Sequence, residues 1–230
     1  MTRTRPTYRR NYRKTTTRKR QSKYIKQGSR RPELKYFDCF ANQNPATPSI
    51  GDIFTAEPFP STWKFVPLNW MDQGTTSTQR VGLRATIKRH IMNIAVRNVS
   101  VLNEALFRIV IFLWNDESVP QNAGAGNNPD AIFTEDSALS LLNPRAQAGK
   151  FRILYDSQAM SIPQTDTAAG YANKAFRYIS WNKAMNVNTQ YGTGSGTDLL
   201  KGALYIGYIQ NTGSTNYNLF YASRVRYTDD

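Results

Sequence analysis

The 230-residue chain is poor in cysteine and histidine and contains no long apolar run. Cys39 is the only cysteine, so no disulfide forms within the chain, which is typical of a reducing compartment. His90 is the only histidine, which excludes the common zinc sites built from several His and Cys ligands. The sequence has no run of 18 apolar residues, so we expect no membrane-spanning helix. The N-terminal charges precede no apolar segment, so we expect no secretory signal.

Catalytic motifs are also missing. The sequence contains no G-x-S-x-G motif and no P-loop, and the glycine-rich segment 192–196 lacks the Lys-Ser/Thr that would follow in a phosphate-binding loop. We interpret Cys39 as a small buried apolar residue and His90 as a structural strand residue, because a nucleophile–base pair would need the fold to bring them together. Calcium bound by carboxylates at a subunit contact stays open as an alternative. We therefore expect no catalytic residue, no cofactor and no metal site.

Acidic residues are absent from residues 1–31, which carry thirteen positive charges. The other 199 residues hold the remaining 17 Lys and Arg against all 16 Asp and Glu, so +13 of the net charge of +14 lies in this segment. A segment that repels itself in this way cannot pack a core, and it stays extended until a polyanion neutralises it. We therefore predict a basic nucleic-acid-binding arm over residues 1–33 and a folded domain over residues 34–230.

The composition of the arm favours single-stranded nucleic acid. Nine of its cations are arginine, whose planar guanidinium matches phosphate oxygens and stacks on bases, and tyrosines separate the charges. Binding is expected to depend on counterion release, with little readout of base sequence. The predicted nucleic-acid-binding residues are Arg3, Arg5, Tyr8, Arg9, Arg10, Tyr12, Arg13, Lys14, Arg18, Lys19, Arg20, Lys23, Tyr24, Lys26, Arg30 and Arg31.

Other interpretations of the arm differ in how well they fit. A solubilising tail would not need thirteen cations without a carboxylate. A nuclear localisation signal extending from Arg9 to Arg20 is compatible with nucleic-acid binding. A membrane-surface helix is disfavoured because the arm has almost no apolar side chains to form a buried face.

The rest of the chain is predicted to be all-β. Segments rich in β-branched and aromatic residues recur between Gly, Pro, Asn and Thr. The predicted strands are 34–40, 62–70, 83–99, 106–114, 150–162, 175–185, 202–210 and 217–228. Eight strands with long loops favour a single eight-stranded jelly roll of two antiparallel sheets over an up-and-down barrel. The loops 122–129 and 189–200 are predicted to be exposed.

Two local features complete this prediction. In the strand 83–99 the apolar residues change parity, from Leu83, Ala85 and Ile87 to Met92, Ile94 and Val96, which predicts a β-bulge near residues 89–91. A helix is predicted over residues 134–142, with Pro144 beyond its end.

Five segments in order resemble capsid proteins of circovirus-like viruses, whose circular single-stranded DNA genomes encode a replication initiator. The first, 33–38 (ELKYFD), follows directly on the basic arm. The others are 68–82, with LNW, QG and QRVG, then 151–156 (FRILYD), 202–206 (GALYI) and 224–229 (RVRYTD). The resemblance spans nearly the whole chain.

The resemblance implies a jelly roll that assembles with identical subunits, about 60 in the simplest (T=1) icosahedral shell, around a single-stranded DNA genome bound by the arm. It also implies a virion protein that enters the host nucleus through an import receptor, and it carries over no catalytic residue. Two alternatives remain open: a capsid of the same architecture that packages RNA, as in satellite viruses, and a histone-like nucleic-acid-binding protein.

Overall fold

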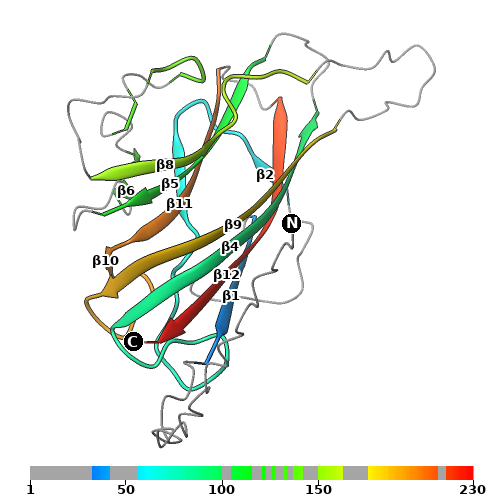
Figure 1. Ribbon diagram of the computed structural model, residues 1–230. Coiled ribbons are helices and arrows are strands. Elements are labelled where there is room, and N and C mark those ends of the chain that lie inside the picture. Colours follow the sequence, from blue (N-terminus) through cyan, green and yellow to red (C-terminus); the bar gives the residue numbers. More distant parts are fainter. Residues whose placement is uncertain are drawn as a thin grey trace, which may run out of the picture. The chain divides into compact units, whose positions relative to one another are not determined.

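The computed structural model is an assembly of β-strands, and it contains no helix in the part of the chain that it describes (Figure 1). The all-β class predicted from the sequence is therefore confirmed. The described residues are 33–41, 56–99, 105–115, 121–122, 126–127, 132–133, 137–141, 150–162, 176–211 and 216–229.

The larger sheet has six antiparallel strands. Its order is β1-β12-β4-β9-β10, with β2 paired beside β12. The strands are β1 (Lys35–Phe40), β2 (Glu57–Pro58), β4 (Arg84–Asn98), β9 (Phe176–Tyr191), β10 (Leu199–Lys201) and β12 (Tyr217–Asp229).

The second sheet has four antiparallel strands in the order β3-β11-β5-β8. Its strands are β3 (Lys64–Pro67), β5 (Phe107–Trp114), β8 (Phe151–Asp156) and β11 (Ala203–Gln210). A separate pair joins β6 (Gln121–Asn122) to β7 (Gly126–Asn127).

The strand order is that of a jelly roll. Eight of the described strands have four or more residues, and in chain order they are β1, β3, β4, β5, β8, β9, β11 and β12. One sheet places the first beside the eighth and the third beside the sixth, and the other places the second beside the seventh and the fourth beside the fifth. This is two interlocked Greek keys, and it confirms the predicted eight-stranded architecture.

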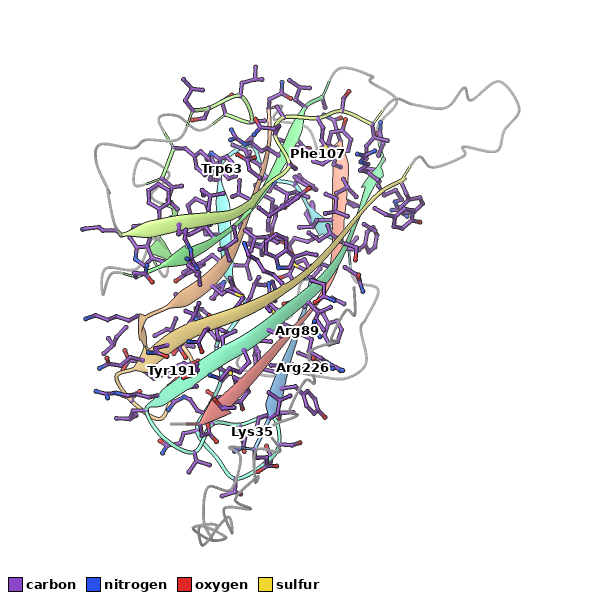
Figure 2. The ribbon with its side chains drawn as sticks, viewed as in Figure 1. Lys35, Trp63, Arg89, Phe107, Tyr191 and Arg226 are labelled. Atoms are coloured by element: carbon purple, nitrogen blue, oxygen red, sulfur yellow. The ribbon has the colours of Figure 1, made fainter. Side chains whose placement is uncertain are left out.

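The core lies between the two sheets, where aromatic side chains from both meet (Figure 2). The ring of Phe107 on β5 is 4.8 Å from that of Tyr217 on β12, and Phe59 packs edge-on against both. Such pairs contribute about 0.5–1.5 kcal/mol each beyond the area that they bury. They hold the sheets face to face.

The four-stranded sheet is also covered on its other side, which leaves β5 and β11 buried along their whole length. The guanidinium of Arg108 lies on that side, where it forms an ion pair with Asp156 at 2.6 Å and donates to the carbonyl of Ser140. The ring of Phe133 stacks on Trp63 with 3.9 Å between the ring centres. The six-stranded sheet, in contrast, has a polar and partly exposed outer face.

The predicted helix over 134–142 is wrong for the residues described. Residues 137–141 form a turn, in which the Ser140 amide donates to the Ser137 carbonyl at 3.1 Å. Ala138 and Ser140 are buried whereas Leu139 and Leu141 are exposed, so burial alternates as it does in an extended chain. The carbonyls of Ala138 and Ser140 accept hydrogen bonds from Arg108, which ties the segment flat onto the sheet.

The predicted bulge is present, one residue earlier than expected. Lys88 has no partner in the register of either neighbouring strand, because Ile87 and Arg89 oppose consecutive residues of β12, Tyr227 and Arg226. The inward side changes there from odd to even positions. An extra residue therefore reconciles the two apolar parities of this long strand.

Strand lengths differ from the prediction where polar residues alternate with apolar ones. β9 continues to Tyr191 rather than ending at residue 185, and Thr189 and Tyr191 are each only 1% exposed. The predicted exposed loop 189–200 is therefore wrong at its start. Conversely, β3 and β8 are shorter than predicted, and β2 and β10 were not predicted. Most of the other predicted loop, 122–129, lies outside the described residues.

Candidate nucleic-acid interface

The arm residues predicted to bind nucleic acid all lie outside the described residues, so their role stays a prediction. Within the described part of the chain, the six-stranded sheet presents a second concentration of arginine. Residues of β1, β4, β9 and β12 alternate between the core side and the outer side, and the register pairs outward residues with outward residues.

The outward residues include several arginines and aromatic rings among uncharged side chains, and we call this surface the arginine face. Its charged and aromatic members are Tyr36, Asp38, Phe40, Arg84, Arg89, Arg97, Phe176, Tyr178, Phe220, Arg224 and Arg226.

One arginine of this face is paired with acid. Arg224 donates from Nε and Nη2 to the two carboxylate oxygens of Asp38, at 2.6 Å each, and its guanidinium lies 4.9 Å from the ring centre of Tyr36. Asp38 raises the pKa of Arg224 above its ordinary value, because the fork of two hydrogen bonds favours the charged form.

The other arginines lack such a partner among the described residues. Arg89 and Arg226 are directly opposite each other in the register of β4 and β12, and Figure 2 shows them on these adjacent strands. Arg97 lies 5.6 Å from the ring centre of Phe220, and its buried Nε has no hydrogen-bond partner. Arg84 is exposed at the far end of β4.

The single histidine and the single cysteine lie on the core side of the same sheet. His90 Nε2 is 2.9 Å from Ser223 Oγ, and Cys39 pairs with Ser223 in the register of β1 and β12. Burial lowers the pKa of His90 to about 4 and raises that of the Cys39 thiol to about 11. Both side chains are at most 3% exposed, so the fold brings them near each other without activating the thiol or admitting a substrate.

The glycine-rich segment 192–196 is held by Arg80. The guanidinium of Arg80 is fully buried 3.9 Å above the ring of Tyr191 and donates from Nη2 to the carbonyls of Thr193 and Ser195. The Gly196 amide already donates to Asp72 Oδ1 at 2.7 Å. The amides of Gly192, Ser195 and Gly196 are thus all used within the protein, and Arg80 holds the carbonyls of the same loop in place.

Two of the segments that carry the sequence resemblance, 68–82 and 202–206, form hydrogen bonds within the body. The side chain of Asn69 donates to the carbonyl of Gly202 and accepts from the amide of Leu204, at 3.1 and 2.9 Å. The backbone amide of Gln73 donates to the carbonyl of Gly194 at 2.8 Å. These bonds tie the long loop before β4 to the segment after β9 and to the start of β11.

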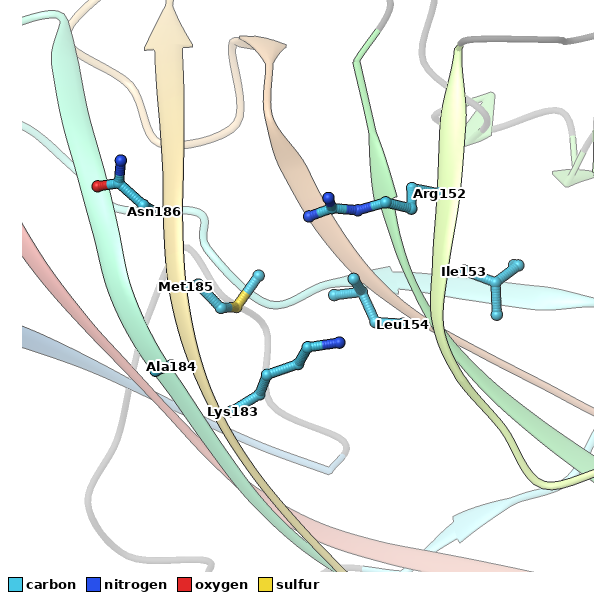
Figure 3. A pocket seen from close by; sticks show the side chains of 7 residues that line it. All are labelled: Arg152, Ile153, Leu154, Lys183, Ala184, Met185 and Asn186. Atoms are coloured by element: carbon cyan, nitrogen blue, oxygen red, sulfur yellow. The ribbon is translucent and has the colours of Figure 1, made fainter.

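A cavity of about 540 Å³ opens between β8 of one sheet and β9 of the other. Arg152 and Lys183 extend into it from the two strands, beside Leu154 and Met185 (Figure 3). Its lining residues include two cations and no carboxylate, so it could accept a small anion. It lies at an open edge of the sandwich rather than in an enclosed site.

In the described part of the chain, no three or more His, Cys, Asp or Glu side chains lie where they could hold a metal ion together. The same residues form no helix of the length and apolar character that a membrane crossing requires.

Sequence reasoning missed the arginine face, although part of its signal was visible. Along residues 217–227 the alternation of Tyr, Leu and Val with Asn, Phe and Arg places Arg224 and Arg226 on one side of the strand. The same rule could not place Arg89, because the bulge at Lys88 reverses the parity of β4.

Comparisons with known proteins leave the family of this chain undetermined. No family model matches the sequence, and no curated protein matches it. A solved structure described as the decameric BFDV capsid protein aligns with 84% of this chain and 93% of its own, at 7% identity and a TM-score of 0.21. A TM-score this low does not establish a shared fold, so the jelly-roll assignment depends on the strand order and register of this chain.

Proposed function

We propose that this protein is a viral coat protein that assembles into a small icosahedral shell and packages a circular single-stranded DNA genome through its arginine-rich arm. The observation that carries the proposal is the division of charge. A nearly neutral jelly-roll body, with 17 cations against 16 carboxylates, follows a segment of thirteen cations and no carboxylate.

The body suits a shell subunit. Its two sheets share one core, which makes a rigid block. A jelly roll of this kind can use its connecting loops for contacts between neighbouring copies. Identical subunits close into a shell through heterologous contacts, and a body with little net charge limits repulsion between them. About 60 copies in a T=1 shell is the simplest arrangement.

The arm suits the packaged polymer. With about 60 copies the arms bring roughly 780 positive charges to the interior, enough to neutralise a similar number of phosphates. Arginine and tyrosine together bind unpaired strands through phosphate contacts and base stacking. The same basic segment would direct the protein to the nucleus through an import receptor before assembly.

The test is negative-stain microscopy of the purified full-length protein, combined with a nuclease-protection assay on the same sample. Uniform round particles that protect nucleic acid would support the proposal, and digesting the extracted polymer with DNase or RNase identifies it as DNA or RNA. Protected RNA would favour the satellite-virus-like alternative. A small species that binds nucleic acid but protects none would overturn the coat-protein function in favour of a histone-like binding protein.

A further inference from the structure

We infer that the arginine face of the six-stranded sheet is a second binding surface for single-stranded nucleic acid, separate from the arm. The inference rests on the proposed function, since it names a further contact for the same polymer. It concerns residues of the folded body.

The charge of the face is unbalanced. Asp38 is its only acidic residue among those that the structure describes, and both carboxylate oxygens of Asp38 accept from Arg224. Four more arginines, Arg84, Arg89, Arg97 and Arg226, share the face without an ion-pair partner in the described chain. Exposed faces of antiparallel sheets usually mix both signs, because like charges opposite each other are unfavourable.

Arg89 and Arg226 are the strongest indication of an anionic ligand. As direct cross-strand partners, their Cβ atoms are expected about 5 Å apart, so their guanidinium groups repel each other in the unliganded protein. A phosphate between them would accept hydrogen bonds from both forks and remove the repulsion. The pair is therefore suited to bind one backbone phosphate.

Aromatic rings lie at the other end of the same strands. Phe176 and Tyr178 stack with their ring centres 5.8 Å apart and are 42% and 73% exposed. Phe176 pairs with Arg97 in the register, and Arg97 lies against Phe220. Exposed rings beside arginine are the arrangement on which unpaired bases stack, at about 1–3 kcal/mol per base.

The two ends are spaced for a strand of several nucleotides. Eight residues separate Arg89 from Arg97 along β4, which is about 26 Å at roughly 3.3 Å per residue. Between these two ends the outward residues include Ala95 and Ala222. Their small side chains project little from the sheet, so they would not obstruct a bound strand. A single strand lying along β4 could thus contact the arginine pair and the aromatic rings together.

A second copy of this face is a poor occupant, because two surfaces rich in arginine repel each other. Double-stranded nucleic acid would satisfy the arginines but leave Phe176 and Tyr178 without unstacked bases. The combination of cations and rings therefore favours a single strand.

The test measures binding of the full-length protein to a fluorescent oligo(dT) of about 20 nucleotides across a range of salt concentrations. The variant R89Q/R226Q should bind about ten-fold more weakly at roughly 150 mM salt, and its log–log salt slope should fall by about 0.7, as expected for the loss of one phosphate contact to a single strand. The matched control variant R152Q/K183Q also removes two positive charges, but from the cavity between β8 and β9. We expect it to bind oligo(dT) with the same affinity as the unmodified protein. Equal losses in both variants would reduce the effect to net charge and overturn the inference.

Photocrosslinking provides the second readout, because it does not depend on a variant folding well. Ultraviolet crosslinking of oligo(dT) followed by peptide mass spectrometry should label peptides that contain Phe176, Tyr178 or Phe220, in addition to the arm. Crosslinks confined to residues 1–31 would overturn the inference and leave the coat-protein proposal intact. Conversely, crosslinks to the face in a protein that forms no particles would support the binding surface and count against the coat-protein function.

Discussion

Arg89 on β4 and Arg226 on β12 lie directly opposite each other on the outer face of the six-stranded sheet, and neither has an ion-pair partner among the described residues. Two like charges at a cross-strand position lower the stability of the sheet in which they lie. We therefore expect this pair to lower the stability of the free protein, and a bound anion to offset that loss.

Neutralising one arginine of this pair should stabilise the free protein. R89Q or R226Q is expected to raise the free energy of unfolding by about 0.2–1 kcal/mol at low salt, and the gain should shrink as salt screens the repulsion. Urea denaturation without nucleic acid measures it. The control is R224Q, which breaks the paired contact with Asp38 and should not stabilise. No salt-dependent gain in either variant would contradict the repulsion.

Arg80 should not tolerate replacement by lysine. Its guanidinium donates to the carbonyls of Met71, Gly82, Thr193 and Ser195, and an ammonium group cannot reproduce this planar arrangement. R80K is expected to lose about 2 kcal/mol or more of stability, since buried carbonyls would lose their donors.

Limited proteolysis provides a second measurement for R80K, because the segment 192–198 should become more easily cleaved when its carbonyls are released. The control Y191F keeps the ring beneath Arg80 and loses one hydrogen bond to the Asn69 carbonyl, so it should cost only about 1 kcal/mol. An R80K protein as stable as Y191F would show that the guanidinium contacts contribute little.

His90 should make stability dependent on pH. Burial lowers its pKa from 6.5 to about 4, so the unfolded chain binds a proton that the folded protein excludes. The contribution of His90 is fully present above pH 6.5 and is lost as the pH falls towards 4. Compared with H90Q, the unmodified protein should lose on the order of 2–3 kcal/mol over this range. Because His90 is the only histidine in the chain, no other histidine contributes to this difference. If the free energy of unfolding changed with pH equally in both proteins, the lowered pKa of His90 would be refuted.

A charge in the central strand should prevent folding. Ile109 and Ile111 are fully buried on β5, so I109D or I111D would place an unpaired carboxylate between the sheets. We expect no folded protein, as judged by far-ultraviolet circular dichroism and yield. V81D is the control, because Val81 is 56% exposed and its replacement should be tolerated. Normal yield of I109D would contradict its burial.

Deleting residues 1–31 should remove the packaged polymer and leave the body folded, because residues 32–230 form a compact unit with a core of their own. The ratio of absorbance at 260 and 280 nm of purified particles measures the loss. Weak binding of oligo(dT) should remain if the arginine face acts as inferred. Failure of the deleted protein to fold would show that the arm is structural.

Much of the fold could be predicted from local pattern. Alternation of apolar and polar residues located the strands near residues 34–40 and 217–228, each with one buried face. Continuous apolar runs located those near 106–114 and 202–210, which are buried on both faces. The helix over 134–142 was predicted wrongly, since the carbonyls of Ala138 and Ser140 bond to Arg108, which lies about 30 residues away in sequence. Such hydrogen bonds between residues far apart in sequence outweigh the local preference for helix.

The candidate sites divide in the same way. The charge of residues 1–31 is a property of composition, so the sequence by itself determined that this chain carries a strongly cationic segment before a nearly neutral body, and it indicated a β-sandwich. Only the tertiary structure decided that Arg89 meets Arg226, because the sheet order, the register and the bulge at Lys88 bring together residues 137 positions apart. Charge and alternation act along the chain, whereas register is set by side chains packing across it.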